Sequence, residues 1–342
     1  MTPKKPAARK PINLALQGGG AHGAFTWGVI DRLLEDGRLD FDAISGTSAG
    51  AMNAVVTVDG LERGGFDGAR ERLDQFWHGV SQGGGRIEPG YQVLQEIIGF
   101  WRSSMQPFSY FPRLTAMASP YRFNPLNINP LRDLLESLVD FERVRKCKSA
   151  RLFVSATNVR TGKIKVFTGP DVTADAVMAS ACLPNLFQAV EIDGEAYWDG
   201  GYMGNPALFP FFEDKQSDDT LLVQINPVRR EKVPRTGVEI AERVSEITFN
   251  ASLLRELRAI DFVNRLLAEN RLDTSRYRPN RLHRIEASEA LEDHGASTKL
   301  DTSWRFFQEL RDAGRSAAAK FLKAHYADVG VRSSFDLRAE FL

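Results

Sequence analysis

The chain has 342 residues, of which 43% are hydrophobic and 26% are charged, values typical of a folded globular protein. Its 44 basic and 44 acidic residues give a formal net charge of zero, which argues against a nucleic-acid binder held by bulk positive charge. The length allows one large domain, or one domain with an appendage, and provides ample chain for a buried core.

Residues 1–11 are rich in lysine, arginine and proline, and we expect them to form a disordered basic tail. No apolar signal segment follows them, and no apolar run reaches the ~18–20 residues of a membrane-spanning helix. The two cysteines, Cys147 and Cys182, are too few for a disulfide framework and fit a reducing compartment. We therefore expect a cytoplasmic protein whose contact with a membrane, if any, is peripheral.

The first elements predict a parallel sheet. Residues 12–17 read as a short strand, and the glycine-rich loop 18–23 leads into a helix over 24–37. Five apolar residues recur at helical spacing in this helix: Phe25, Val29, Ile30, Leu33 and Leu34. Because the next strand begins at Phe41, the stretch predicts a right-handed βαβ unit.

The loop before the helix satisfies Gly-x-Gly-x-x-Gly through Gly18, Gly20 and Gly23, a pattern typical of dinucleotide-binding folds. Such folds need an acidic side chain at the end of the second strand, but that strand ends here in serine, glycine and threonine. Loops that follow adjacent parallel strands lie side by side. We therefore expect the amides of Gly19 and Gly20 next to Ser48, where they can donate to an oxygen that becomes negative.

The second strand runs into Gly46-Thr47-Ser48-Ala49-Gly50, and a helix begins near Ala49. This Gly-x-Ser-x-Gly pattern predicts a sharp turn with Ser48 at its apex, where the glycines leave room for neighbouring backbone. The positive end of the helix favours negative charge near the hydroxyl. Ser48 is therefore a candidate nucleophile, with a chance turn of small residues as the alternative in a chain of 28 glycines.

A helix is expected over 66–82, followed by an insertion over about 85–130. Aromatic residues gather over 91–123, partly in a stretch rich in proline and asparagine. Such a segment suits an acyl-chain channel, a lid or an interfacial patch, and equally an insertion that buries its own aromatic side chains.

The remaining core elements lead to a second candidate residue. We expect helices over 131–139 and 173–181, and strands over 151–158, 163–167, 188–192, 196–199 and 220–227. Asp199 follows an aromatic strand and precedes Gly200 and Gly201, which let the backbone turn away. A carboxylate in this position can approach another loop closely, although an Asp-Gly turn is the simpler interpretation of Asp199 alone.

Beyond the charged linker 229–235 the pattern changes to long helices, over about 240–267 and 302–325, with a short strand-like stretch at 282–286. One apolar stripe predicts that the first of these helices packs on the core, with partner or membrane contact as the alternative. The stripe comprises Ile240, Val244, Ile247, Leu254, Leu257, Ile260, Val263, Leu266 and Leu267. We divide the chain into a catalytic domain over 12–228 and a mainly helical C-terminal extension over 229–342.

A serine hydroxyl needs a proton acceptor within hydrogen-bond reach. His22 lies in the glycine loop but can equally face solvent. His283, His294 and His325 follow the core strands and do not fit the order Ser, acid, His of an α/β-hydrolase triad. Asp199 is therefore the best candidate base, because a poorly solvated carboxylate can form a dyad with a serine.

Three ordered motifs resemble the signatures of the patatin-like phospholipase family: GGGAHG at 18–23, GTSAG at 46–50 and DGG at 199–201. The stretch ASACLP at 179–184 also resembles the segment that precedes the family's catalytic aspartate. The similarity covers roughly residues 12–226. Three motifs in order are much more specific than any one of them.

The resemblance implies an α/β fold, a three-layer α/β/α sandwich around a mainly parallel sheet, and hydrolysis of lipid acyl esters. Carried over residue by residue, it makes Ser48 the nucleophile and Asp199 the base, with Gly18, Gly19 and Gly20 as the oxyanion-hole loop. The C-terminal helices are an extension of this fold.

The chain departs from the common family pattern at His22, where many members carry arginine, which puts in doubt a fixed positive charge near the oxyanion. His22 and Ala49 are accessory candidates. No cofactor is expected, and no His, Asp or Glu cluster has the spacing of a metal site. The expected partner is a lipid or acyl-ester substrate of phospholipase A or lysophospholipase type. Alternatives are the same dyad acting on a thioester or an intracellular polyester, and a non-catalytic lipid-binding protein.

Overall fold

A mixed eight-stranded sheet forms the middle of the molecule in the computed structural model. The structure describes residues 8–83, 119–212, 217–288, 290–291, 298–299 and 301–341. The strands are β1 (Lys10–Leu16), β2 (Leu39–Gly46), β3 (Arg151–Asn158), β4 (Ile164–Thr168), β5 (Val190–Ile192), β6 (Glu195–Asp199), β7 (Asp219–Gln224) and β8 (Arg281–Glu286). Their order is β5-β6-β3-β2-β1-β7-β8, with β4 paired to β3. The five strands from β3 to β8 in this order are parallel, and β4, β5 and β6 add antiparallel pairs.

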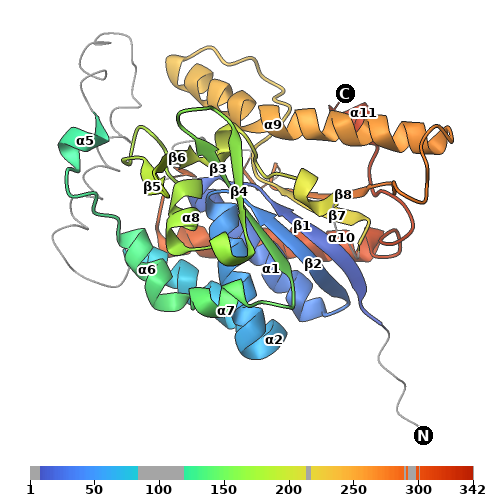
Figure 1. Ribbon diagram of the computed structural model, residues 1–342, viewed down its shortest axis with the longest axis horizontal. Helices are drawn as coiled ribbons and strands as arrows, with labels where there is room; N and C mark the ends of the chain where they lie inside the picture. The colour runs from blue at the N-terminus through green and yellow to red at the C-terminus, as the bar shows by residue number, and fades with distance from the viewer. Residues whose placement is uncertain are drawn as a thin grey trace, which may run out of the picture.

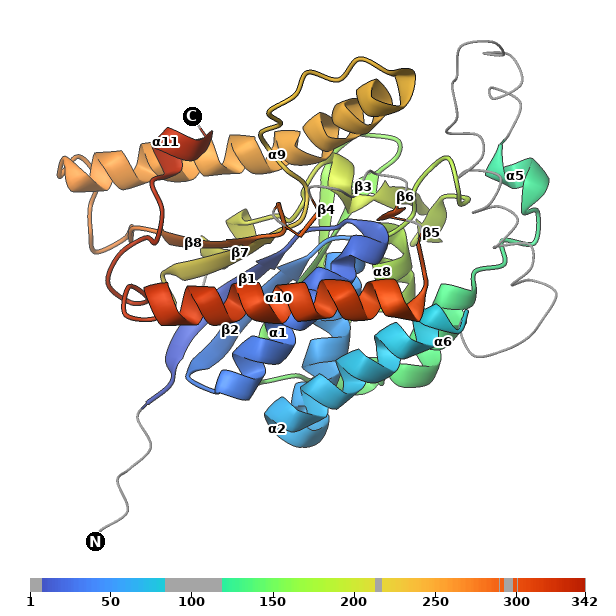
Figure 2. The same cartoon turned by 180° about the vertical axis from the view of Figure 1, so that it is seen from behind.

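Helices cover both faces of this sheet. They are α1 (Gly23–Asp36), α2 (Ala49–Ser81), α5 (Pro120–Phe123), α6 (Pro130–Leu138), α7 (Phe141–Arg145), α8 (Ala174–Ser180), α9 (Gly237–Ala268), α10 (Trp304–His325) and α11 (Leu337–Phe341). Short 3-10 turns are η1 (Gly20–His22), η2 (Gly169–Asp171), η3 (Gly200–Tyr202) and η4 (Phe209–Phe212). Figures 1 and 2 show α1, α2 and α10 on one face and α9 with α11 on the other. The expected three-layer α/β/α sandwich is confirmed.

A separate hydrophobic core fills each face. The larger core joins the sheet to α1, α2 and α10, and Trp27, Phe76 and Phe307 are almost completely buried in it. The smaller core joins the sheet to α9 and α11 through residues such as Leu257 and Phe341. Because buried apolar area is the main stabilising contribution, these two cores hold the three layers together.

The N-terminal βαβ unit matches the expectation, with one change at its start. α1 ends at Asp36, and Gly37 after it takes the left-handed conformation at φ 72° that terminates many helices. β1 begins at Lys10 and not at Ile12, so two residues assigned to the tail belong to the sheet. The Lys10 ammonium group donates to the carbonyls of Tyr326 and Val329 at 3.0 and 2.7 Å, which fixes this end of the strand.

The C-terminal region contributes to the sheet as well as to the helical layers. β8 pairs in parallel with β7 along its whole length. α10 lies close against α1 because two glycines allow it: a Cβ on Gly28 would meet the Arg311 backbone, and one on Gly314 would meet the Phe25 carbonyl. The region 229–342 therefore contains, besides the expected helices, the strand β8, which pairs with β7 at one edge of the sheet.

The apolar stripe of α9 packs on the core over only part of the helix. Leu257 and Leu267 are buried as expected, but Ile240, Val244 and Ile247 are 48%, 58% and 54% exposed. The prediction of a continuous core-facing stripe is wrong for this first part, because the core beneath α9 is formed with its second half.

Most of the aromatic insertion, residues 84–118, lies outside the described residues. Its expected role as a channel, lid or interfacial patch therefore stays a prediction. In the part of the chain that the structure describes, no helix is long and apolar enough to span a bilayer.

Candidate functional site

Ser48 lies at the turn between β2 and α2, at the edge of the sheet where the parallel strands end. Its φ of 54° is rare for a residue with a side chain and marks a strained turn. The turn is tight, since a Cβ on Gly46 would lie 2.5 Å from the Gly50 carbonyl oxygen. Thr47 anchors it by donating from its hydroxyl to the Gly204 carbonyl at 2.6 Å. The predicted strand-to-helix turn is confirmed, with Ser48 at its apex.

Asp199 ends β6 and is only 1% exposed. Its backbone is held on both sides: its amide donates to the Cys182 carbonyl at 2.8 Å, and the Thr157 hydroxyl donates to its carbonyl at 2.8 Å. Its carboxylate Oδ1 accepts a hydrogen bond from the Gly201 amide at 2.7 Å. The carboxyl group is therefore fixed in a buried position.

The Ser48 side chain and the Asp199 carboxyl group face each other although they come from distant parts of the chain. Burial raises the pKa of Asp199 to about 7, while hydrogen bonds from the Gly201 amide and the Ser48 side chain and the charge of Lys299 act in the opposite direction. A carboxyl group that changes protonation near neutral pH is suited to accept and return a proton.

The glycine loop lines the same cavity as Ser48 and Asp199. The Gly18 amide is engaged, because it donates to Asn205 Oδ1 at 2.7 Å. The amides of Gly19 and Gly20 have no acceptor among the described residues, and both glycines line a cavity together with Ser48. The sequence predicts all three glycines as the oxyanion-hole loop. The Gly18 amide already has an acceptor, so only the amides of Gly19 and Gly20 remain as candidate donors to an oxyanion.

The cavity beside Ser48 and Asp199 is mainly apolar and has a volume of about 290 Å³. Its walls come from α2, α6 and the segment after α8, and include Met52, Phe76, Trp77, Val80, Leu134 and Leu183. A cavity with apolar walls and a few convergent polar groups is typical of a small-molecule or acyl-chain site.

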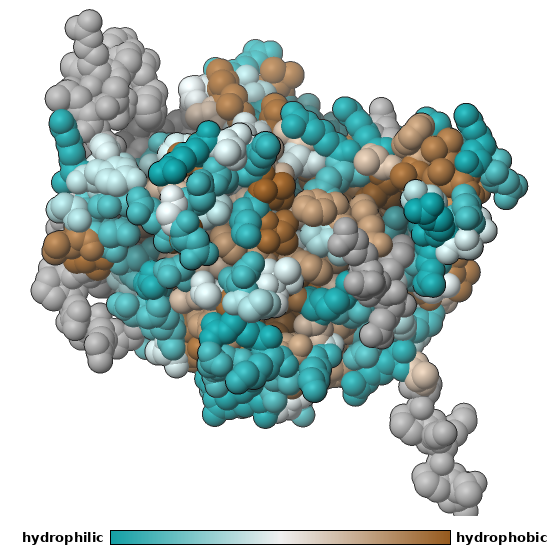
Figure 3. Space-filling view, viewed as in Figure 1, coloured by the Kyte–Doolittle hydropathy of each residue, from teal (hydrophilic) through white to brown (hydrophobic). Residues whose placement is uncertain are grey.

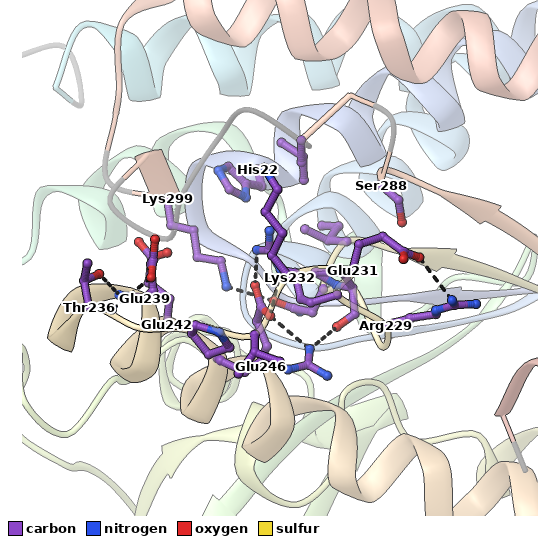
Figure 4. A pocket seen from close by; sticks show the side chains of 18 of the residues that line it. His22, Arg229, Glu231, Lys232, Thr236, Glu239, Glu242, Glu246, Ser288 and Lys299 are labelled. Atoms are coloured by element: carbon purple, nitrogen blue, oxygen red, sulfur yellow. Dashed lines mark hydrogen bonds and ion pairs between the residues drawn. The ribbon is translucent and has the colours of Figure 1, made fainter.

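A second, larger pocket of about 1030 Å³ is strongly charged and does not contain Ser48 or Asp199. It lies between the glycine loop, residues 225–236 and the first turns of α9, as Figure 4 shows. Arg230 and Arg243 pair there with the buried Glu246. Asn226 and Lys299 line both this pocket and the cavity of Ser48.

The accessory candidates lie in different places. Ala49 lines the cavity of Ser48 at the start of α2. His22 is only 3% exposed, so it does not face solvent, and its Nε2 lies 2.7 Å from Thr298 Oγ1. It lines the charged pocket. None of the histidines that the structure describes lines the cavity of Ser48.

Three residues of the site were not identified from the sequence. Ser180 Oγ accepts the Ser48 amide at 2.9 Å, and it lies in the stretch 179–184 that the family resemblance had singled out. Asn226 donates to the Gly18 carbonyl at 2.9 Å, and Lys299 donates to Asn226 Oδ1 at 2.8 Å. No local sequence pattern predicts that Lys299 lies at this site, because its position depends on packing between distant parts of the chain.

A family model and one curated relative match a large part of the chain. The family model "Patatin-like phospholipase" matches residues 14–212, more than half of the chain. The "cGAMP-activated phospholipase" of Escherichia coli (strain TW11681) is 27% identical over 237 residues, which are 60% of this chain and 57% of that protein. The chain thus matches less than two thirds of the length of this relative.

Two solved structures are similar at low sequence identity. VipD from Legionella pneumophila is 14% identical with a TM-score of 0.41, covering 92% of this chain and 72% of VipD. ExoU from Pseudomonas aeruginosa, solved in complex with SpcU, is 15% identical with a TM-score of 0.33, covering 91% of this chain and 53% of ExoU.

Proposed function

This chain belongs to the patatin-like phospholipase family, and we propose that it is a serine acyl hydrolase that cleaves carboxylic esters of lipids. Ser48 is the nucleophile and Asp199 the base in this proposal. The observation that carries it is the meeting of the Ser48 side chain, a buried carboxyl group of raised pKa and two available amides at one apolar cavity.

In the first half of the reaction, Ser48 Oγ attacks the ester carbonyl carbon while Asp199 takes the hydroxyl proton. The carbonyl oxygen becomes negative and accepts hydrogen bonds from the amides of Gly19 and Gly20. The tetrahedral intermediate then collapses, the bond to the alcohol breaks, and Asp199 returns the proton to the departing alkoxide. The products of this half are a free alcohol and an acyl group on Ser48.

In the second half, water attacks the acyl-enzyme and gives its proton to Asp199. The same two amides stabilise the second oxyanion. Collapse breaks the bond to Ser48 Oγ, which recovers the proton from Asp199, and the carboxylic acid leaves. The dyad is restored without any other group.

The apolar walls of the cavity support an acyl chain as the part of the substrate that is bound beside Ser48. A thioester or polyester with a similar chain would use the same centre. Hydrolysis of phospholipid vesicles, short acyl esters, acyl thioesters and polyester granules under one set of conditions ranks these substrate classes. Faster hydrolysis of the vesicles supports a phospholipase. Faster hydrolysis of thioesters or granules would identify that class as the substrate instead.

Peripheral contact with a lipid surface is part of the proposal. Ser245 and Phe249 of α9 line the cavity, and Ile240, Val244 and Ile247 are exposed on the same helix. Figure 3 shows patches of hydrophobic surface among hydrophilic surface at the top of that view, where the first part of α9 lies. We expect replacement of these three residues by serine to weaken sedimentation with phospholipid vesicles while hydrolysis of a short, dissolved ester persists.

An active-site-directed phosphonate tests the nucleophile directly. We expect it to label the wild-type protein and not Ser48→Ala. Ser45→Ala is the matched control, because Ser45 is buried on β2, the strand that leads to Ser48, donates to the Ala207 carbonyl at 2.7 Å and does not line the cavity. Equal labelling of the wild type and Ser48→Ala would refute the proposed role of Ser48.

A further inference from the structure

Lys299 joins the two pockets of the molecule. It lies between β8 and α10, outside the residues 14–212 that match the family model. Its side chain lines the apolar cavity of Ser48 and Asp199 and also the charged pocket. Figure 4 shows this side chain extending into the charged pocket below His22.

Lys299 and its neighbour contact the glycine loop at several points. The carbonyl oxygen of Lys299 lies against the loop, where a Cβ on Gly20 would be 2.5 Å away. The Lys299 ammonium group donates to Asn226 Oδ1 at 2.8 Å, and Asn226 Nδ2 donates in turn to the Gly18 carbonyl at 2.9 Å. Thr298 Oγ1 lies 2.7 Å from His22 Nε2, at the end of the same loop. These contacts hold the segment 298–299 and the loop in one arrangement.

The charged groups around Lys299 come from α9, the linker before it and β6. The pKa of Lys299 is lowered from its ordinary value, chiefly by burial and also by the charge of Arg230. The charges of Glu246, Glu242 and Asp199 act in the opposite direction. The negative groups favour the protonated form of Lys299 and so oppose the effect of burial.

The groups around Asp199 include one cationic side chain. Burial raises the pKa of Asp199, and the Gly201 amide, the Ser48 side chain and the charge of Lys299 lower it. Burial and the nearby Asp199 charge raise the pKa of Cys182 to about 12, and they also raise the pKa of Tyr202, so both stay neutral near pH 7. Among the described residues, Lys299 is the cationic group whose charge acts on this carboxyl group.

We propose that Lys299 is a positioning residue of the active site, which keeps a positive charge beside Asp199 and orders the glycine loop through Asn226. This inference rests on the proposed function for its effect on hydrolysis. Lys299 acts through the base and the loop.

The pH dependence of hydrolysis tests this role in four variants. Lys299→Gln removes the charge and keeps a polar end, Lys299→Met removes both, and Lys299→Arg keeps the charge. Lys232→Met is the matched control, since Lys232 lines the charged pocket but not the cavity of Ser48. Without the Lys299 charge, we expect the acid midpoint of kcat/KM to rise, because an opposite charge near a carboxyl group lowers its pKa.

Lys299→Arg should keep the midpoint of the wild type, and Lys232→Met should leave it unchanged. A loss of activity caused only by looser packing would lower kcat without moving the midpoint. An unmoved midpoint in a folded Lys299→Gln protein would therefore overturn the inference, even when the wild type hydrolyses esters through Ser48. Circular dichroism checks folding, and Lys299→Gln alone decides the question if Lys299→Met does not fold.

A measurement without substrate separates this inference from the proposed function. Aspartate labelled with ¹³C at the carboxyl carbon reports the titration of Asp199 by NMR, and Asp199→Asn assigns its signal. We expect the Asp199 midpoint to be higher in Lys299→Gln than in the wild type and in Lys232→Met. Equal midpoints overturn the inference, whereas absence of hydrolysis and of Ser48 labelling in the wild type overturns the proposed function alone.

Discussion

The backbone amide of Ser48 donates a hydrogen bond to Ser180 Oγ at 2.9 Å. Two residues further along the same stretch, the Cys182 carbonyl accepts the Asp199 amide at 2.8 Å. One short segment at the end of α8 therefore holds the backbone of both proposed dyad members. Their relative position depends on this segment as much as on the strands that carry them.

Removal of the Ser180 hydroxyl should disturb Ser48 without removing it. In Ser180→Ala the Ser48 amide loses its acceptor, and an unsatisfied buried amide costs about 1–3 kcal/mol. We expect kcat to fall roughly tenfold or more, with little change in KM, because the position of the nucleophile is affected and the cavity is not. Steady-state kinetics on a short acyl ester measures this.

Ser155→Ala is the control for that substitution. Ser155 is fully buried, and its hydroxyl has no hydrogen-bond partner among the described residues. Its removal should leave kcat near the value of the wild type. A Ser180→Ala protein with unchanged kcat would show that Ser48 does not need this support.

The rate of hydrolysis should depend on the protonation of Asp199. Burial raises its pKa to about 7, and only the ionised carboxylate can accept the Ser48 proton. We therefore expect kcat/KM to rise with pH through a midpoint near 7. A midpoint near the ordinary carboxyl value of about 4 would contradict a buried base.

The same carboxyl group should make folding stability depend on pH. The pKa of Asp199 is about 7 in the folded state and near 3.8 when the group is exposed. A raised carboxyl pKa stabilises the fold fully below about pH 3.8 and loses this contribution as the pH rises towards and through 7. Asp199→Asn has no charge to bury, so it should be inactive yet more stable above pH 7.

Chemical denaturation at several pH values measures this difference. The gain in unfolding free energy should reach a few kcal/mol, because each pKa unit corresponds to about 1.4 kcal/mol. Glu256, whose pKa burial also raises to about 7, contributes equally to the wild type and the variant and cancels in the comparison. A gain that does not vary with pH would argue against a charged Asp199 at neutral pH.

The size of the apolar cavity should limit the acyl chain. Leu134 of α6 lines the cavity and is only 7% exposed, so Leu134→Trp would fill part of it. We expect kcat/KM to fall for long acyl chains and to persist for short ones, as measured on an ester series with one leaving group. Leu138→Trp is the control, since Leu138 lies on the same helix and does not line the cavity. Equal losses for all chain lengths would mean that this cavity does not hold the acyl chain.

The central part of the fold was readable from the sequence because its signals are local. The run into Ser48 carries an apolar strand, paired glycines and a helix start, and β2 and α2 follow it closely. The hairpin of β3 and β4 and the helix stopped before Pro184 were also predicted, since turn residues and periodicity mark them.

Features that depend on distant packing were not readable. The helical spacing of apolar residues in α9 indicated an apolar face. It did not indicate that Ile240 and Val244 lie beyond the part of the helix that packs on the core. Lys299 reaches the site only because α10 packs on α1 and β8 completes the sheet. A residue whose role depends on contacts with Asn226 and Gly20 leaves no periodic pattern in its own surroundings.

The pairing of β7 with β8 affects how this protein assembles during translation. β7 leaves the ribosome before the long α9 helix, so its outer edge has no partner until residues 281–286 have also emerged. An open strand edge is prone to pair with other chains. We therefore expect the nascent chain to depend on molecular chaperones most during this interval. Ser48 and Asp199 are synthesised early, but the framework around them is completed only when the late strand and α10 have docked.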